Sequence, residues 1–181
     1  IMPLGDSVTQ ADSSHASYRR NLWRLITREP FSVDFIGSLQ ENFEGPNPYQ
    51  DFDLDHEGHW GWRADEISEM LPTWLALNVP DIALIHLGGN DVLQNQTTSS
   101  TISDLENIVS ILRTANPKIA ILIAQLIPLP FNNQFIEELN SQIPTLAARL
   151  DTDLSQVIVV DQNTGFEPGD LTYDGIHPNE E

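Results

Sequence analysis

The sequence opens with Ile-Met-Pro-Leu-Gly-Asp-Ser-Val-Thr over residues Ile1–Thr9, in which an apolar run stops at Gly5-Asp6-Ser7. A short apolar run that gives way to a glycine and a polar segment predicts a strand, a tight turn and the start of a helix. This leaves the Ser7 hydroxyl at the end of a strand and near a helix N-terminus, where free backbone N–H groups can receive an oxyanion. The stretch therefore places a candidate nucleophile at the edge of a sheet.

The groups that a serine nucleophile requires stand at the far end of the chain. Activation of a serine hydroxyl at neutral pH needs a base and a group that orients the base. Asp174-Gly-Ile-His177 contains both, and a carboxylate at this spacing can accept the imidazole Nδ1–H within one turn, which leaves Nε2 free for the serine. We expect Ser7, His177 and Asp174 to form a catalytic triad.

Composition narrows the class of protein. The 181 residues suit a single catalytic domain over 1–181, and we expect both ends to be truncated because the chain opens inside a predicted strand. Eight basic against 27 acidic residues give a net charge of −19, which argues against nucleic acid or an anionic membrane as a partner. The absence of cysteine excludes disulfides and a cysteine nucleophile. No apolar stretch approaches the roughly 20 residues of a membrane span.

Strands and helices alternate along the rest of the chain. Short apolar runs predict further strands at Val33–Gly37, Ile82–Leu87, Ile119–Ile127 and Val157–Val160. Apolar residues at helical spacing predict helices at about Ser17–Arg28, at about Ala64–Asn78 and over Phe135–Leu150. The capping box Ser103-Asp-Leu-Glu106 predicts the start of a further helix. The polar segment Ser38–Trp60 shows no period and is expected to be a long loop. This alternation predicts an α/β fold, with a parallel sheet and helices on both of its faces.

Two further polar signals stand at or just beyond the ends of predicted strands, at Gly61 and at Asn90. In an open α/β sheet, ligands bind at the carboxyl edge of the strands. Glycine suits a place where the backbone comes close to a substrate oxygen, and an amide donates a hydrogen bond without carrying charge. We expect both residues to meet Ser7 in one crevice.

Four sequence blocks, in order and widely spaced, resemble the SGNH or GDSL-type hydrolases. They are Gly5-Asp6-Ser7, Gly58-His-Trp-Gly61, Gly88-Gly-Asn90-Asp91 and Asp174-Gly-Ile-His177-Pro178. Within that superfamily, Asp55-His-Glu-Gly-His59 followed by Gly61-Trp62 looks most like the carbohydrate esterases of family 3, which are acetyl esterases acting on xylan and related acetylated sugars.

This resemblance implies a three-layer α/β/α fold with a five-stranded parallel sheet in the order 2-1-3-4-5. By matching positions, Ser7 is the nucleophile, His177 the general base and Asp174 the residue that orients it. The oxyanion hole consists of Ser7 N–H, Gly61 N–H and the Asn90 side-chain amide. The implied substrate is an acetylated polysaccharide or small ester, with no cofactor and no metal. A secreted protein is expected, with its signal peptide outside this chain, and the sequon Asn95-Gln-Thr97 agrees with that location.

Trp60 is the clearest departure from the family pattern, because a small residue is common there. We expect Trp62 to pack into the core and Trp60 to border the ester site, where an indole covers a sugar face or narrows the acyl pocket. His59 is a second candidate for substrate binding, because it lies two residues before Gly61.

Other polar residues have plainer interpretations. Asp6 and Asp91 are expected to accept hydrogen bonds from nearby backbone amides. The alternating carboxylates of Asp51–Glu57 hint at calcium, but an EF-hand loop needs glycine at its sixth place, where His56 stands. We therefore favour a solvated acidic loop. The remaining histidines are expected to be a hydrogen-bonded core residue at His86 and solvated loop residues at His15 and His56.

Three functions stay open on this evidence. The leading hypothesis is a serine esterase that removes acetyl groups from a polysaccharide. The second is a lipase or thioesterase of the same superfamily, although the polar, acidic segment Ser38–Trp60 suits a sugar better than a long acyl chain. The third is a catalytically dead carbohydrate-binding module, which would be expected to lack Ser7, Asn90 or His177.

Overall fold

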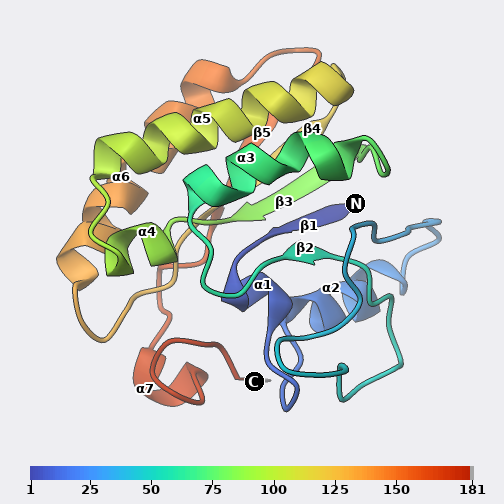
Figure 1. Cartoon of the computed structure of the whole chain (residues 1–181), viewed down its shortest axis with the longest axis horizontal. Coiled ribbons are helices and arrows are strands. Elements are labelled where there is room, and N and C mark those ends of the chain that lie inside the picture. Colours follow the sequence, from blue (N-terminus) through green and yellow to red (C-terminus); the bar gives the residue numbers. More distant parts are fainter. Residues whose placement is uncertain (180–181) are drawn as a thin grey trace.

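The computed structural model describes residues 1–179, and a five-stranded parallel sheet forms its centre (Figure 1). The strands are β1 Met2–Gly5, β2 Glu57–Gly58, β3 Ile82–His86, β4 Ala120–Gln125 and β5 Val157–Asp161. They stand in the order β2-β1-β3-β4-β5, and each neighbouring pair is parallel. The predicted fold class and the 2-1-3-4-5 order are confirmed.

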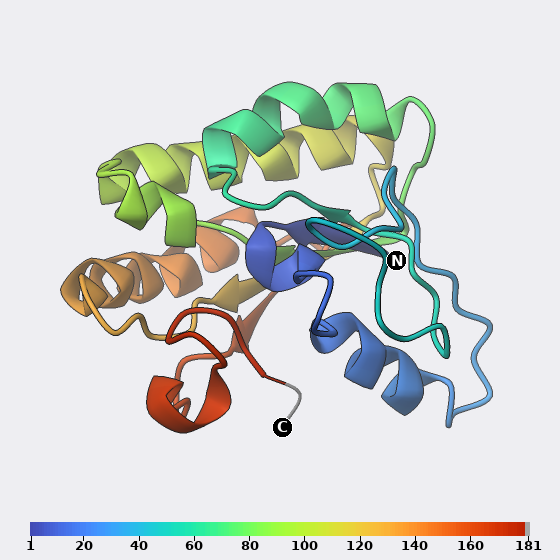
Figure 2. The same ribbon diagram turned by 60° about the horizontal axis from the view of Figure 1, so that its bottom comes forward.

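Helices lie on both sides of this sheet. They are α1 Ser7–Gln10, α2 Tyr18–Ile26, α3 Ala64–Leu75, α4 Gly89–Leu93, α5 Thr98–Ala115, α6 Asn133–Leu150 and α7 Pro168–Leu171. Figure 2 shows α3 and α5 on one side of the sheet and α2 and α7 on the other, and α6 contacts α5, β4 and β5. Within residues 1–179, no helix combines the length and the apolar character that crossing a membrane would require.

The main core lies between the sheet and the layer that contains α3 and α5. Alternate strand residues such as Ile85 and Ile123 point into it and are almost completely buried, as the period of two in a strand requires. Leu84 and Leu122, one position earlier, point to the opposite face and are only half-buried. One face of the sheet is therefore covered by the core, and the other borders a cavity that Leu84 and Leu122 line.

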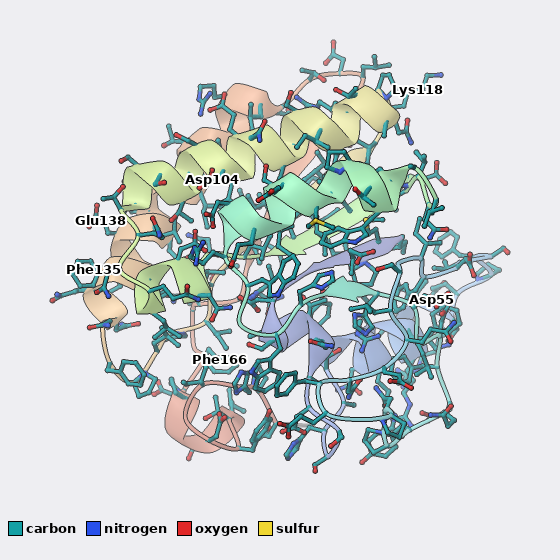
Figure 3. All side chains as sticks on the ribbon, in the orientation of Figure 1. Asp55, Asp104, Lys118, Phe135, Glu138 and Phe166 are labelled. Atoms are coloured by element: carbon teal, nitrogen blue, oxygen red, sulfur yellow. The ribbon has the colours of Figure 1, made fainter. Side chains whose placement is uncertain are left out.

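The apolar stripes of two helices are narrower than predicted. In α3, Met70 is 36% exposed, whereas Ile67 and Leu71 are fully buried. Phe135 was expected to begin the inward stripe of α6, but it is exposed near Glu138 in the first turns of that helix (Figure 3). Pro72 and Pro144 lie inside α3 and α6, and both helices continue past them.

The prediction of a second strand at Val33–Gly37 is wrong, because the second strand is Glu57–Gly58, inside the expected loop. Among the described residues, the segment 33–37 makes backbone-to-backbone hydrogen bonds with Ile1 alone, which donates from its amino group to the Asp34 carbonyl and accepts from the Ile36 N–H. Two N–H groups that a β-strand would donate to a neighbouring strand donate here to side-chain carboxylates. Asp53 accepts from Phe35 N–H, and Glu57 accepts from Ser38 N–H, each at 2.8 Å.

Helix α5 begins five residues before the predicted capping box. Its N-cap is Thr97, whose hydroxyl oxygen accepts from Ser100 N–H at 3.2 Å. Ser103 lies inside the helix, where its hydroxyl donates to the carbonyl of Ser99, and Glu106 pairs with Arg149 of α6. A serine followed three residues later by glutamate therefore occurs here at a helical position that needs no cap.

The segment between α2 and β2 is tied to α1 by Arg19, whose side chain is completely buried. Its guanidinium donates to the carbonyls of Thr9 at 2.9 Å, Leu54 at 2.7 Å and Gln10 at 3.3 Å. Burial lowers the pKa of Arg19 to about 10, so the group stays charged at neutral pH. Charge-assisted hydrogen bonds to carbonyls compensate the cost of desolvating the guanidinium. Two of them also hold α1, the helix that begins at Ser7.

The acidic segment Asp51–Glu57 is less solvated than predicted. Asp51 pairs with Arg20 and Arg24, and Glu57 is completely buried in β2. In the part of the chain that the structure describes, no group of three or more histidine, aspartate and glutamate side chains has a metal-binding arrangement. The carboxylates instead anchor the loop to α2 and to the sheet.

Candidate active site

Ser7 is the first residue of α1, directly after β1, and its side chain is buried at the carboxyl edge of the sheet. Asp6 is the N-cap, and its carboxylate accepts from Val8 N–H at 3.0 Å, which is the structural role predicted for it. The turn needs glycine before Asp6, because a Cβ on Gly5 would lie 2.2 Å from Thr9 Oγ1 and 2.7 Å from the His86 carbonyl oxygen. Gly5 and Asp6 therefore fix the turn that carries the buried Ser7 hydroxyl.

We expect Asp6 to make the protein less stable as the pH rises from about 4 to about 7. Burial raises the pKa of Asp6 to about 7, against the opposing effect of the Val8 N–H. In that window the folded protein holds a proton that the unfolded chain has lost, so stability falls as the pH rises, by about 1.4 kcal/mol for each unit of pKa difference. Asp6→Asn keeps an acceptor for Val8 and removes the titration. Melting temperatures measured from pH 4 to pH 8 should therefore diverge; parallel curves would contradict the buried, protonated carboxyl.

Asp174 and His177 lie in the loop after α7 and face Ser7. His177 Nε2 is 2.9 Å from Ser7 Oγ, and His177 Nδ1 is 2.7 Å from Asp174 Oδ2. The other carboxylate oxygen, Oδ1, accepts from the N–H groups of Ile176 and His177 at 2.9 and 2.8 Å. Burial alone would raise the pKa of Asp174, but the hydrogen bonds from His177 and Ile176 hold it below its ordinary value. The structure brings the three predicted residues into one hydrogen-bonded chain.

Aromatic rings hold the imidazole of His177. Trp60 stacks on it with ring centroids 4.4 Å apart, and Tyr173 stacks on it at 5.7 Å. Trp60 also stacks on Phe43 at 4.6 Å, and its backbone N–H donates to Gln10 Oε1 at 2.8 Å. Trp60 therefore borders the site as a support of His177, and its contact with Phe43 leaves less of the indole free for a sugar than expected. The contributions of Phe43 and Tyr173 carry no signal in the sequence.

His59 packs between two tryptophan rings and a buried carboxylate. Its ring stacks on Trp62 at 4.7 Å and on Trp74 at 4.4 Å, and Nε2 lies 2.8 Å from the buried carboxylate of Glu57. Trp62 packs against the main core, as predicted. These contacts give His59 a packing role, and the expectation that it binds substrate stays a prediction.

The three candidate oxyanion donors lie at the same sheet edge. Asn90 is in the first turn of α4, and its Nδ2 donates to the Trp62 carbonyl at 2.9 Å, which fixes the amide and leaves its second N–H. Gly61 has φ +80°, and a Cβ there would meet no atom within 4 Å. Glycine is required at this place by its left-handed backbone. Among the described residues, Ser7 N–H and Gly61 N–H donate to no protein acceptor.

Two neighbouring predictions have opposite outcomes. Asp91 is structural as expected, because its carboxylate accepts from Ala64 N–H at 3.0 Å and from the Thr101 hydroxyl at 3.3 Å. His86 is buried at the end of β3 as expected, but neither of its ring nitrogens has a hydrogen-bond partner among the residues described. Burial lowers the pKa of His86 to about 4, so its ring is neutral.

The two loop histidines are not free in solvent. His56 is completely buried; its Nδ1 accepts from Gly58 N–H at 3.0 Å, and burial lowers its pKa. His15 lies 2.8 Å from Asp12 Oδ1 and stacks on Tyr173 at 3.7 Å. The prediction of a solvated histidine is wrong for His56, whereas His15 is partly exposed but is held by Asp12 and Tyr173.

The arrangement has the parts of a nucleophilic centre. A hydroxyl faces an imidazole nitrogen whose partner nitrogen faces a carboxylate, and the Asn90 amide lines the same small cavity as Ser7. Such a set can form a covalent acyl intermediate and stabilise the negative charge of its tetrahedral precursor.

Comparison with known proteins gives consistent similarities. One solved structure is a carbohydrate esterase family 3 protein from Talaromyces cellulolyticus, 34% identical with a TM-score of 0.88 over 98% of this chain and 87% of that one. A mutant acetyl esterase solved with an acetate ion is 33% identical, with a TM-score of 0.88 over 98% and 87% of the two chains. The "Multidomain esterase" of Ruminococcus flavefaciens is 26% identical over an alignment of 203 positions. This alignment covers 99% of this chain and 26% of that relative. The chain spans half or less of the length of the curated relatives that it matches.

The family model for the GDSL-like Lipase/Acylhydrolase family matches residues 4–181. Together with identities above 30% to solved carbohydrate esterases, this confirms the resemblance that the four sequence blocks carry. The chain belongs to the GDSL-like Lipase/Acylhydrolase family and is similar, within it, to the carbohydrate esterases of family 3.

Proposed function

We propose that the protein is a serine esterase that removes acetyl groups from a carbohydrate such as acetylated xylan. The observation that carries this proposal is the chain of contacts from Ser7 Oγ through His177 to Asp174, 2.9 Å and 2.7 Å long, at the carboxyl edge of a GDSL-family sheet. The similarity to proteins described as acetyl esterase and carbohydrate esterase supports the choice of leaving group and acyl group.

The mechanism follows from the positions of the donors and acceptors. His177 Nε2 takes the proton of Ser7 Oγ as that oxygen attacks the ester carbonyl carbon, and the Asp174 carboxylate stabilises the resulting imidazolium. The N–H groups of Ser7 and Gly61 and the free N–H of Asn90 receive the oxyanion. The tetrahedral intermediate collapses when His177 returns the proton to the sugar oxygen, which leaves acetyl-Ser7. Water, deprotonated by His177, then releases acetate and restores the hydroxyl.

Truncation of Asn90 tests the oxyanion assignment. We expect Asn90→Ala to lower kcat by about 10²–10³, because the missing donor acts on charge that develops only in the transition state. KM should change much less for the same reason. Asn107→Ala is a suitable control, because this amide donates to Ser68 Oγ in a partly buried contact between α5 and α3. Equal kinetics for Asn90→Ala and the control would contradict the assignment.

A substrate panel tests the proposed function. Nitrophenyl acetate, butyrate and decanoate are compared with acetylated xylan, from which released acetate is measured. We expect acetate esters to be hydrolysed fastest and acetate to be released from xylan. A preference for decanoate would favour the lipase or thioesterase alternative, and binding of xylan without hydrolysis would favour the carbohydrate-binding module.

A further inference from the structure

A small cavity opens beside Ser7. It has a volume of about 30 Å³ and is lined by Ser7 and Asn90 together with apolar side chains, among them Leu93, Leu129 and Ile176. Neither His177 nor Trp60 belongs to the lining among the described residues. The cavity thus starts at the proposed nucleophile and one proposed oxyanion donor and continues into an apolar environment.

The chemistry of ester cleavage decides which part of the substrate enters this cavity. His177 must return its proton to the oxygen of the leaving sugar, so the sugar lies on the side of His177 and Trp60. The oxyanion points at the donors of Ser7, Gly61 and Asn90. The remaining substituent of the carbonyl carbon is the acyl chain. We assign this chain to the cavity beside Ser7, because the described residues that line that cavity include neither His177 nor Trp60.

The size of the cavity limits the acyl chain. One water-sized group needs about 10–15 Å³ of such volume, so about 30 Å³ accommodates roughly two groups of that size. An acetyl methyl group fits with little room left, whereas the three carbons beyond the carbonyl of a butyryl group do not. The apolar lining favours a methyl group over water by the ordinary hydrophobic effect.

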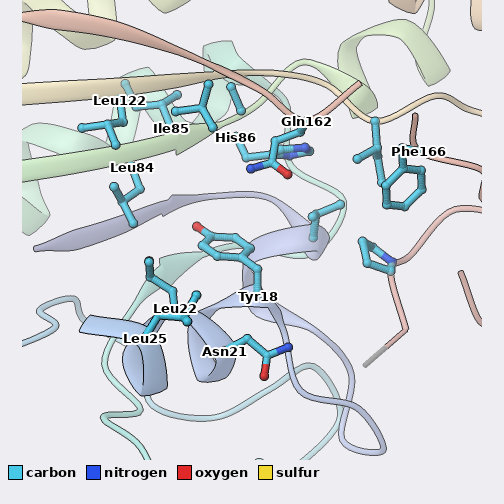
Figure 4. A pocket seen from close by; sticks show the side chains of 15 residues that line it. Tyr18, Asn21, Leu22, Leu25, Leu84, Ile85, His86, Leu122, Gln162 and Phe166 are labelled. Carbon is cyan, nitrogen blue, oxygen red and sulfur yellow. The ribbon is translucent and has the colours of Figure 1, made fainter. Parts of the chain in front are cut away.

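A much larger cavity lies directly behind the small one. It has a volume of about 390 Å³ and is bounded by α2 and the half-buried face of the sheet, with Leu22 and Leu122 among its lining residues (Figure 4). Val8, His86 and Ile127 line both cavities and therefore stand between them. The His86 ring has no hydrogen-bond partner among the described residues, so no hydrogen bond of this ring ties this part of the wall to its neighbours.

We propose that the cavity beside Ser7 is the acyl pocket, and that Val8, His86 and Ile127 restrict it to an acetyl group by closing it against the larger cavity. This assignment rests on the proposed esterase function. It gives Trp60 the leaving-group side of the site and removes it from the acyl pocket.

Shortening the wall should let longer acyl chains reach the larger cavity. The measured quantity is the ratio of kcat/KM for nitrophenyl butyrate to that for nitrophenyl acetate, with nitrophenyl hexanoate as a further point. We expect Ile127→Ala to raise this ratio at least tenfold. Val8→Ala, at a half-buried position, removes less packing than Ile127→Ala, and it should raise the ratio in the same direction if Ile127→Ala fails to fold.

Leu22→Ala is the matched control, because Leu22 lines only the larger cavity, and its ratio should equal that of the wild type. Hydrolysis of acetate by the wild type, with an unchanged ratio in folded Ile127→Ala and Val8→Ala, would overturn the acyl pocket and leave the esterase function standing. Failure of the wild type to hydrolyse any of the three esters would overturn the proposed function itself.

Discussion

Ser7→Ala is expected to reduce ester turnover by at least about four orders of magnitude. Ser7 Oγ is the proposed nucleophile, and it lies 2.9 Å from His177 Nε2. Loss of the nucleophile of a serine triad removes the covalent pathway, and only binding and the oxyanion donors remain to accelerate hydrolysis by water. The substitution should leave the fold intact, because the Cβ remains and only one side-chain contact is lost.

The measurement is kcat/KM on nitrophenyl acetate, together with the melting temperature of each variant. Ser14→Ala provides the control, because Ser14 is exposed in the loop that follows α1, and it should retain full activity. Turnover by Ser7→Ala within tenfold of the wild type would mean that another group attacks the ester.

Asp174→Asn is expected to lower kcat by a factor of about 10⁴, because the loop fixes which atom of the asparagine faces His177. Oδ1 of Asp174 accepts from two backbone N–H groups, of Ile176 and His177, so the oxygen of an asparagine will occupy that position. Its NH₂ group then faces His177 Nδ1 and selects the tautomer with the proton on Nε2. That tautomer cannot accept the Ser7 proton.

Asp170→Asn is the matched control, since Asp170 is an exposed acid of α7 in the same segment. A loss of less than tenfold in Asp174→Asn would show that the rings of Trp60 and Tyr173 suffice to orient His177. The role proposed for the carboxylate would then be wrong.

The site residues could be found from the sequence because the topology brings them together. Ser7 and Asn90 each follow a parallel strand, and the carboxyl ends of such strands share one edge of the sheet. The Asp174/His177 pair has a local spacing that depends on no distant contact. For these residues, strand order and short-range geometry were sufficient.

The second strand could not be predicted because it consists of two residues, Glu57 and Gly58, and has no periodicity to detect. Its place depends on the burial of Glu57, whose carboxylate accepts from Ser38 N–H and the Ser38 hydroxyl. Such a contact exists only after the long loop has folded back onto the sheet. The same folding turns His56 from an expected surface residue into a buried one.

The surroundings of the site escaped prediction for a related reason. Trp60, which stacks on His177, and Phe43, which stacks on Trp60, come from segments far from His177 in the sequence, and such stacking has no sequence spacing. His59 was expected at the cleft from its distance to Gly61 in the sequence, and its stacking on Trp62 and Trp74 could not be foreseen from that spacing.

The most direct test of the central claim is covalent labelling of the nucleophile. The protein is treated with a nitrophenyl phosphonate, which transfers its phosphonyl group to an activated serine, and is then digested for mass spectrometry. We expect one adduct, on the peptide that contains Ser7, with activity lost in proportion to labelling and with no adduct in Ser7→Ala. Loss of activity with Ser7 unmodified, or an adduct on another residue, would contradict the proposal that Ser7 attacks the ester.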